Sequence, residues 1–78
     1  MQKIKIYTKK FCPACTKTQE MLKARKIKYE LIDLTTDLAA IEAFARLGYR
    51  RFPIVLVEDN HEVTGWDGFQ PQLISKLK

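Results

Sequence analysis

The chain has 78 residues and a net charge of +5, with 14 Lys and Arg against 9 Asp and Glu. This length suits one small domain and excludes two, and no segment approaches the ~20 apolar residues of a transmembrane helix. The first ten residues, MQKIKIYTKK, lack the apolar core of a secretory signal. We therefore expect a cytoplasmic protein, in which a cysteine pair is more often catalytic or metal-binding than a lasting structural disulfide.

Positive charge is concentrated in residues 1–28, which carry +8, whereas residues 29–78 carry −3. Such asymmetry is typical of nucleic-acid binding, of an electropositive surface near a reactive anion or acidic partner, or of a solvated basic face. The aromatic residues are not interleaved with Lys and Arg as a base-stacking platform requires. A non-enzymatic nucleic-acid binder is therefore the weaker alternative, and we expect neither nucleic acid nor a membrane as a partner.

The beginning of the chain predicts a strand and then a helix. Residues 3–8 alternate Lys with Ile, which indicates a strand with one buried face. The helix should start just after Cys12, because Pro13 suits the first helical position, where its missing N–H costs little. Helical spacing then places small or apolar groups on one face: Ala14, Thr18, Met21, Leu22 and the stem of Arg25.

The middle of the chain repeats this pattern. Residues 27–34 are rich in apolar and β-branched side chains and predict a second strand. Residues 35–49 predict a helix that ends at Gly48. It can begin at any of three N-caps: Thr35, Thr36 or Asp37. Its apolar face should contain Leu38, Ile41, Phe44 and Ala45.

The last part predicts two strands and a short helix. The apolar run 53–59 should be a central strand, followed by a turn and a fourth strand over residues 61–66. Asp67 and Gln70 have the spacing of a capping box for a last helix, whose inward residues are Leu73, Ile74 and Leu77. The order β-α-β-α-β-β-α predicts one α/β domain over residues 1–78, a four-stranded mixed sheet flanked by three helices.

The only two cysteines, Cys12 and Cys15, allow three interpretations. A structural zinc site needs four ligands, and the chain adds only His61, so it would require carboxylates or a zinc-linked dimer. A structural disulfide across so short a loop would stabilise the fold little. A Cys-x-x-Cys pair at the strand-to-helix junction of a β-α-β unit is typical of a redox centre, and we favour that interpretation.

In a redox pair, Cys12 should attack the substrate and Cys15 should resolve the mixed disulfide. Cys12 lies at the predicted helix N-terminus, where backbone N–H groups and the macrodipole stabilise an anion. Lys9 and Lys10 add positive charge, so we expect the pKa of the Cys12 thiol to be lowered and more attacking thiolate to be present. Cys15, one turn later on the same face, should reach Cys12 but not an outside substrate.

Five stretches of the sequence carry a resemblance to a known family: Tyr7-Thr8-Lys9, the Cys12–Cys15 pair, Leu47-Gly48-Tyr49, Phe52-Pro53 and WDGFQP at 66–71. With the element order, they make the chain resemble the thioredoxin/glutaredoxin superfamily. Within it, the chain is similar to the NrdH-redoxins, which are glutaredoxin-like in sequence and thioredoxin-like in activity. The resemblance spans almost the whole chain. It implies a thioredoxin-like fold and a thiol–disulfide oxidoreductase.

The resemblance also implies roles near the cysteines. Pro53 would be a cis-proline facing the pair, with the backbone of Phe52 turned outward to bind an extended substrate segment. The residues alone would instead favour a trans proline that opens a strand. Phe11 and Phe52, if exposed, would form a docking surface for partner proteins, although Phe11 suits core packing equally well.

Four positions depart from the family pattern. Asp67 stands where the family has Ser, Gln70 where it has Arg, and Gln72 where it has Asp. Whatever the family's Arg holds should therefore be held more weakly here. Ala14 stands where the usual glutaredoxin motif has Tyr, and the dipeptide between the cysteines tunes the redox potential.

The electron donor depends on the stretch Gly65-Trp66-Asp67-Gly68. Glutaredoxins resemble one another in a Gly-Gly-x-Asp stretch here, which holds glutathione. Trp66 in place of the second Gly should disrupt that cradle, although it can equally be a packing residue, and Asp67 and Lys9 could still hold glutathione. We therefore expect thioredoxin reductase as the donor, with a glutathione-dependent glutaredoxin as the alternative.

The remaining expectations concern partners. The resemblance implies the large subunit of class Ib ribonucleotide reductase as the main acceptor. No cofactor should be bound, because electrons from NADPH would reach the Cys12–Cys15 disulfide through a separate reductase. We expect a monomer whose contacts with partners are made by Lys9, Phe11, Phe52, Pro53 and Trp66.

Overall fold

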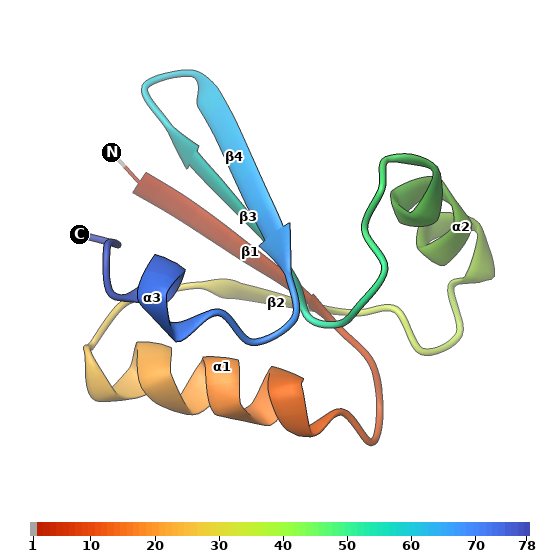
Figure 1. Ribbon diagram of the computed structural model, residues 1–78, viewed down its shortest axis with the longest axis horizontal. Helices are drawn as coiled ribbons and strands as arrows, with labels where there is room; N and C mark the ends of the chain where they lie inside the picture. Colours follow the sequence, from red (N-terminus) through yellow and green to blue (C-terminus); the bar gives the residue numbers. More distant parts are fainter. Residues whose placement is uncertain (1) are drawn as a thin grey trace.

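The computed structural model describes residues 2–78 (Figure 1). The elements are β1 (Gln2–Thr8), α1 (Pro13–Ala24), β2 (Glu30–Asp33), α2 (Leu38–Arg46), β3 (Ile54–Asp59), β4 (Glu62–Asp67) and α3 (Pro71–Ile74). The predicted element order is therefore confirmed. No helix in this range is long and apolar enough to cross a membrane.

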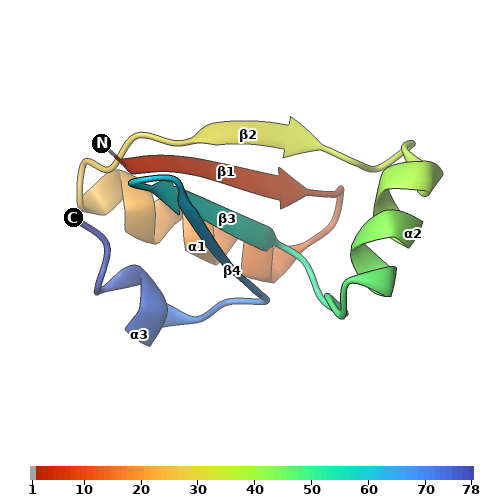
Figure 2. The same ribbon diagram turned by 90° about the horizontal axis from the view of Figure 1, so that it is seen from above.

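The four strands form one mixed sheet in the order β2-β1-β3-β4. β1 is parallel to β2 and antiparallel to β3, and β3 is antiparallel to β4. Strand alternation points one set of apolar side chains to the face that α1 and α3 cover (Figures 1 and 2). The core on this face consists of Ile4, Ile6, Leu22, Val55, Val57 and Ile74.

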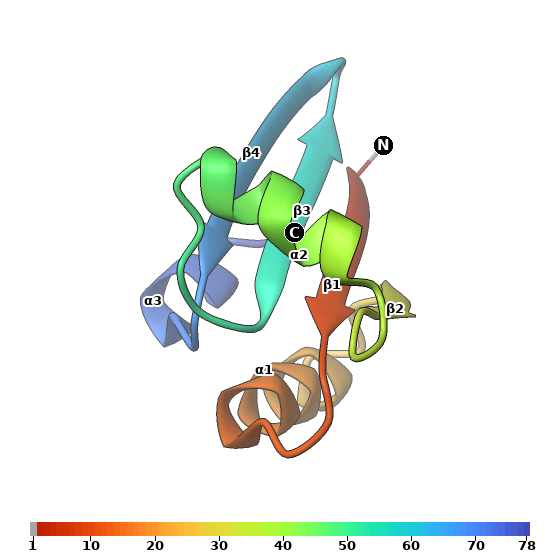
Figure 3. The ribbon, with the colours of Figure 1, turned by 90° about the vertical axis from the view of Figure 1, so that its right-hand side faces the viewer.

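The second helix packs differently. α2 contains no buried residue, and Leu38 is 69 % exposed. The predicted apolar face is therefore only partly right, because Ile41 and Phe44 are half-buried whereas Leu38 and Ala45 are exposed. α2 lies near the end of the sheet at which β1 and β2 finish, apart from α1 (Figures 2 and 3).

A small aromatic cluster attaches α2 to the sheet. The ring centroid of Phe44 lies 4.8 Å from that of Tyr7 in β1 and 5.8 Å from that of Tyr49, which follows the helix. Offset or tilted aromatic pairs at such distances are favourable beyond the area they bury. The side chain of Tyr49 also reaches β4, since a Cβ at Gly65 would lie 2.5 Å from its hydroxyl oxygen. Gly65 therefore leaves the space that Tyr49 occupies.

The bounds of β2, α2 and α3 differ most from the sequence predictions, whereas β3 and β4 each begin one residue later than predicted. β2 starts at Glu30 rather than at residue 27. The backbone of Ile27 still caps the C-terminal end of α1, because its N–H donates to the Leu22 carbonyl at 3.0 Å. α2 is shorter than residues 35–49, and its N-cap is Asp37, whose carboxylate accepts the Ala40 N–H at 3.1 Å. Asp37 is thus the one of the three candidate caps that is used.

The third difference concerns the last helix, where the predicted capping box is wrong. The N-cap is Gln70, which makes no side-chain capping hydrogen bond, and α3 is a single turn. Asp67 is instead the last residue of β4. Its carboxylate accepts backbone N–H groups of the loop that contains Arg50 and Arg51. The three-residue spacing between Asp67 and Gln70 therefore does not mark a helix start.

Candidate active site

β1 and α1 position the cysteine pair. β1 ends at Thr8, and α1 begins at Pro13, as predicted. Cys12 is the N-cap, with an extended backbone (φ −122°, ψ 95°), and its Sγ accepts the N–H of Cys15 at 3.2 Å. The residue before it, Phe11, has a positive φ of 58°. The chain thus turns sharply and presents the sulfur of Cys12 at the start of the helix.

Cys12 and Cys15 form a disulfide, which is the oxidised form of a redox pair. Cys15 is only 2 % exposed and lies on the same buried face of α1 as Thr18 and Leu22. Cys12 is half-buried and lines an open groove. A molecule from outside therefore meets the sulfur of Cys12 first, which is the geometry that an attacking Cys12 and a resolving Cys15 require.

The two lysines before the pair have different surroundings. Nζ of Lys9 lies 5.2 Å from the ring centroid of Phe52, within the range of a cation–π contact. The backbone N–H of Lys10 donates to Oγ1 of Thr35 at 2.9 Å. Lys10 is thus tied to the end of β2, whereas Lys9 lines the groove beside Cys12.

An acidic group near Lys10 offsets part of its charge. Oδ1 of Asp33 accepts the backbone N–H of Thr35 at 2.7 Å. The hydrogen bonds from Thr35, its side chain first, hold the pKa of Asp33 below its ordinary value, and the positive charge of Lys10 adds a smaller effect in the same direction. Of the two cations predicted beside Cys12, Lys9 is the one that lines the groove.

A groove of about 520 Å³ opens beside Cys12. Its lining consists of Lys9, Phe11, Cys12, Pro13, Ala14, Ile41, Arg50, Arg51 and Phe52. Four of these were predicted from the sequence as catalytic or contact residues: Lys9, Phe11, Cys12 and Phe52. Phe11 is 97 % exposed, so it does not pack in the core. Phe52 is half-buried.

Three lining residues were missed by sequence reasoning. Arg50 and Arg51 come directly before Phe52-Pro53, so their adjacency to the predicted cis-proline was an available signal. Ile41 was assigned only to a buried helix face. It reaches the groove because α2 lies near the end of the sheet rather than over its centre.

The loop opposite Cys12 contains the predicted cis-proline. The Phe52–Pro53 peptide bond is cis, Pro53 is buried, and its carbonyl accepts the N–H of Gly68 at 2.9 Å. Within residues 2–78, the backbone N–H and C=O of Phe52 make no loop or turn hydrogen bond. An extended segment lying in the groove could pair with them.

Asp67 connects the end of β4 to this loop. One carboxylate oxygen accepts the backbone N–H groups of Arg50 at 2.6 Å and Arg51 at 3.0 Å, and the other lies 3.8 Å from the Arg51 guanidinium. The hydrogen bond from the Arg50 amide is the main cause that holds the pKa of Asp67 below its ordinary value. The carboxylate is thus engaged with the loop, not with the first turn of α3.

Trp66 lies outside the groove lining. It stands opposite Val55 in the strand register and packs half-buried against the core. Its indole N–H is buried and has no hydrogen-bond partner in the described part of the chain. The structure therefore places Trp66 as a packing residue, and a role in partner contact or in excluding glutathione stays a prediction.

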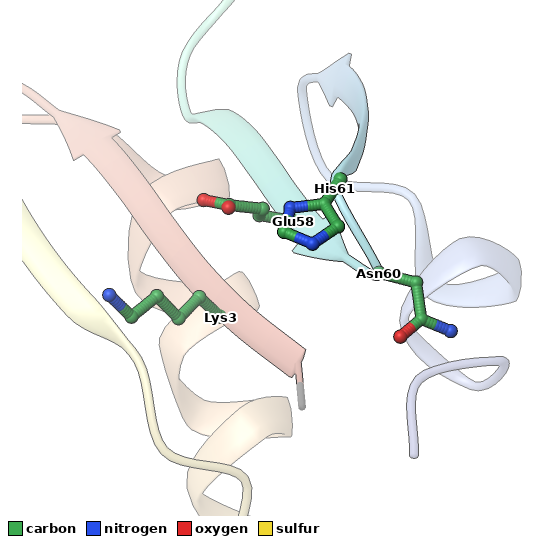
Figure 4. A pocket seen from close by; sticks show the side chains of 4 residues that line it. All are labelled: Lys3, Glu58, Asn60 and His61. Atoms are coloured by element: carbon green, nitrogen blue, oxygen red, sulfur yellow. The ribbon is translucent and has the colours of Figure 1, made fainter.

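His61, considered above as a metal ligand, lies far from the cysteines. It is in the turn between β3 and β4, at the end of the sheet where β1 begins, and lines a pocket with Lys3, Glu58 and Asn60. In this pocket the Asn60 side chain points away from Glu58 (Figure 4). Among residues 2–78, no group of three or more His, Cys, Asp or Glu side chains could hold a metal ion.

The fold and the cysteine pair are those of thioredoxin-like redox proteins. The sequence model of the Glutaredoxin family matches residues 4–62, and the chain belongs to this family. It is similar in structure to the glutaredoxin-like protein NrdH-redoxin from Escherichia coli, with 32 % identity, a TM-score of 0.85 and coverage of 97 % of this chain and 95 % of that one. That protein is described as having a thioredoxin-like activity profile.

Two further structures are more distant. A thioredoxin-like protein shares 31 % identity at a TM-score of 0.70, with coverage of 97 % of this chain and all (100 %) of the other. Plasmodium falciparum thioredoxin shares the fold, at 17 % identity and a TM-score of 0.57. The matched region covers 96 % of this chain and 66 % of the thioredoxin chain. A search of curated protein sequences gave no significant match.

Proposed function

We propose that this protein is a dithiol electron carrier that reduces protein disulfides through Cys12 and Cys15. The observation that carries this proposal is the difference in exposure across the pair. The sulfur of Cys12 borders an open groove, whereas Cys15 is buried and within bonding reach of Cys12. Membership of the glutaredoxin family supports the same chemistry.

The reaction begins with the reduced dithiol. The Cys12 thiolate attacks one sulfur of the target disulfide, so that a Cys12–target disulfide forms, the target S–S bond breaks, and the leaving thiolate takes a proton. Cys15 then loses its proton and attacks Sγ of Cys12, which forms the Cys12–Cys15 disulfide and releases the second target thiolate, and this thiolate also takes a proton. Two electrons and two protons pass from the dithiol to the target.

Two local groups favour the attacking thiolate. The Cys15 N–H already points at Sγ of Cys12 at 3.2 Å, and hydrogen bonds to an ionised acceptor are stronger than neutral ones. Cys12 is also the N-cap of the 12-residue helix α1, where the macrodipole favours negative charge. Both effects act on Cys12 rather than on Cys15, as the order of attack demands.

For the electron donor we propose thioredoxin reductase, which would pass electrons from NADPH to the disulfide without a cofactor bound to this chain. The similarity to NrdH-redoxin, with its thioredoxin-like activity profile, supports this donor. The contacts of Asp67 support it too, because a carboxylate that already binds the amides of Arg50 and Arg51 is less available to hold glutathione. The large subunit of class Ib ribonucleotide reductase is the proposed acceptor. The protein would act as a cytoplasmic monomer.

Reduction by glutathione is the second candidate, favoured by the match to the Glutaredoxin model. One experiment separates the two: insulin reduction with NADPH and thioredoxin reductase, compared with NADPH, glutathione and glutathione reductase. We expect turnover in the first system. Turnover in the second system alone would identify a glutathione-dependent glutaredoxin, and no turnover in either would overturn the oxidoreductase proposal.

A further inference from the structure

The charged side chains that line the groove beside Cys12 all carry the same sign. They are Lys9, Arg50 and Arg51. Asp67, the last residue of β4, lies 3.8 Å from Arg51 and takes up part of its charge, while its other oxygen binds backbone amides. Arg50 is bound through its amide, so its guanidinium takes no part in that contact. Lys9 and Arg50 therefore leave the groove electropositive.

The rest of the lining is largely apolar. Phe11 is 97 % exposed, and Ile41, Ala14 and Pro13 lie in the same lining. Covering a large exposed apolar side chain with another molecule lowers the free energy of the system. The surface beside Cys12 thus combines apolar contact area with unneutralised positive charge, and a docking segment should complement both.

We propose that this groove selects target disulfides that lie in a segment with acidic side chains next to the cysteines. This inference rests on the proposed function and specifies its substrate class. Acidic side chains would meet Lys9 and Arg50, and the aliphatic part of the segment would cover Phe11. Complementary charge mainly increases the association rate and the choice of partner, so the preference should appear in the rate at which Cys12 reacts.

Matched peptides test this inference. Three peptides would carry the same Cys-x-x-Cys disulfide, flanked on both sides by two Glu, two Gln or two Lys. The chemically pre-reduced protein is mixed with each peptide, and the second-order rate constant is measured by acid quenching and chromatography. Each value is divided by the rate constant for dithiothreitol with the same peptide, which removes the effect of flanking charge on the disulfide itself.

At 20 mM salt we expect the Glu peptide to react about fivefold faster than the Gln peptide, and the Lys peptide to react more slowly than both, since each exposed ion pair is only modestly favourable. In 0.5 M NaCl the difference should fall below about twofold, because salt screens exposed charges. Equal rate constants for the Glu and Gln peptides at low salt would overturn the inference.

Variants locate the preference within the molecule. Arg50→Gln keeps the backbone N–H that Asp67 accepts and removes one groove charge, so the Glu-to-Gln ratio should fall by about half or more. Lys76→Gln removes the same charge after α3, away from the groove, and should leave the ratio unchanged. Equal effects of both variants would mean that net charge alone sets the preference, which would overturn a role for the groove.

Insulin reduction by the same pre-reduced protein separates this inference from the proposed function. If insulin is reduced and none of the peptides is, the groove does not accept such segments, and the inference is wrong while the oxidoreductase proposal stands. If neither insulin nor any peptide is reduced, the proposed function itself fails.

Discussion

The two sides of the sheet differ in how their helices are held. α1 and α3 pack over one face, where Leu22 and Ile74 are fully buried, and together with the strands they form the core. α2 contains no buried residue and is attached through the rings of Phe44, Tyr7 and Tyr49. One helix of the active-site region is thus part of the core, and the other is attached by a few side chains.

This difference separates two tasks. The redox pair lies on the core-packed helix, and the position of Cys15 depends on the same buried face as Leu22. The opposite wall of the groove is formed by residues of α2 and the loop before Pro53, which Asp67 links to β4. Substitutions in this wall should therefore have little effect on the buried packing that positions Cys15.

The largest effect should come from the pair itself. Cys12→Ser removes the attacking thiolate, so turnover in the insulin assay should fall below detection. Cys15→Ser removes only the resolving thiol, and the protein should accumulate as a mixed disulfide with its target, visible by non-reducing electrophoresis. If Cys15→Ser turned over protein substrates like the wild type, the assignment of the buried cysteine as the resolving group would be wrong.

A pair of Leu substitutions compares the two helices directly. Leu22→Ala in α1 leaves a cavity in the core and should lower the free energy of unfolding by about 2–5 kcal/mol. Leu38→Ala in α2, where the side chain is exposed, should change it by less than about 0.5 kcal/mol. Urea unfolding followed by circular dichroism measures both. Similar losses for the two variants would contradict the distinction between a core-packed and a loosely attached helix.

Gly65 tests how Tyr49 contributes to the attachment of α2. In Gly65→Ala the new Cβ would lie 2.5 Å from the Tyr49 hydroxyl oxygen and 2.7 Å from Cδ2 of Leu56, so Tyr49 must move. We expect a loss of about 1–3 kcal/mol in the free energy of unfolding.

The matched control for this crowding is Tyr49→Phe, which removes only the hydroxyl. Combined with Gly65→Ala in a double-mutant cycle, it should recover part of the loss, because the two positions are in contact. Strict additivity of the two changes would show that the hydroxyl is not the source of the crowding.

The smallest effect concerns Asp67 and depends on pH. Since the folded-state pKa of Asp67 is lowered, the ionised carboxylate stabilises the fold above its unfolded pKa of roughly 4, and this stabilisation is lost as pH falls through the lower folded-state value. Asp67→Asn should therefore reduce stability by about 1 kcal/mol at pH 7.

Urea unfolding of both proteins between pH 2 and pH 7 checks this sign. The difference between Asp67→Asn and the wild type should shrink as the pH drops below about 4. A difference that is constant over this range would mean that the carboxylate charge contributes nothing and that only its hydrogen-bond geometry matters.

Much of the fold was predictable because its signals are local. Alternating Lys and Ile indicated β1, Pro13 after Cys12 indicated the start of α1, and the element order was correct throughout. The capping box at Asp67 failed for a specific reason. A carboxylate can accept N–H groups from any nearby backbone, and that of Asp67 accepts those of Arg50 and Arg51, which lie well before it in the sequence.

Local signals were enough to predict the Cys12–Cys15 pair and the order of the elements, and the family resemblance predicted the cis Phe52–Pro53 bond. Local spacing and helix-terminus chemistry act between neighbouring residues, so they can be recognised before folding is known. Three outcomes follow only from the folded structure: Phe11 is exposed, Trp66 packs half-buried against the core, and Ile41, Arg50 and Arg51 join Lys9 beside Cys12. Ile41, Arg50 and Arg51 reach the groove through the position of α2 and the loop that follows it. Like the exposure of Phe11 and the packing of Trp66, this position is set by contacts between segments distant in the sequence, which spacing along the chain does not determine.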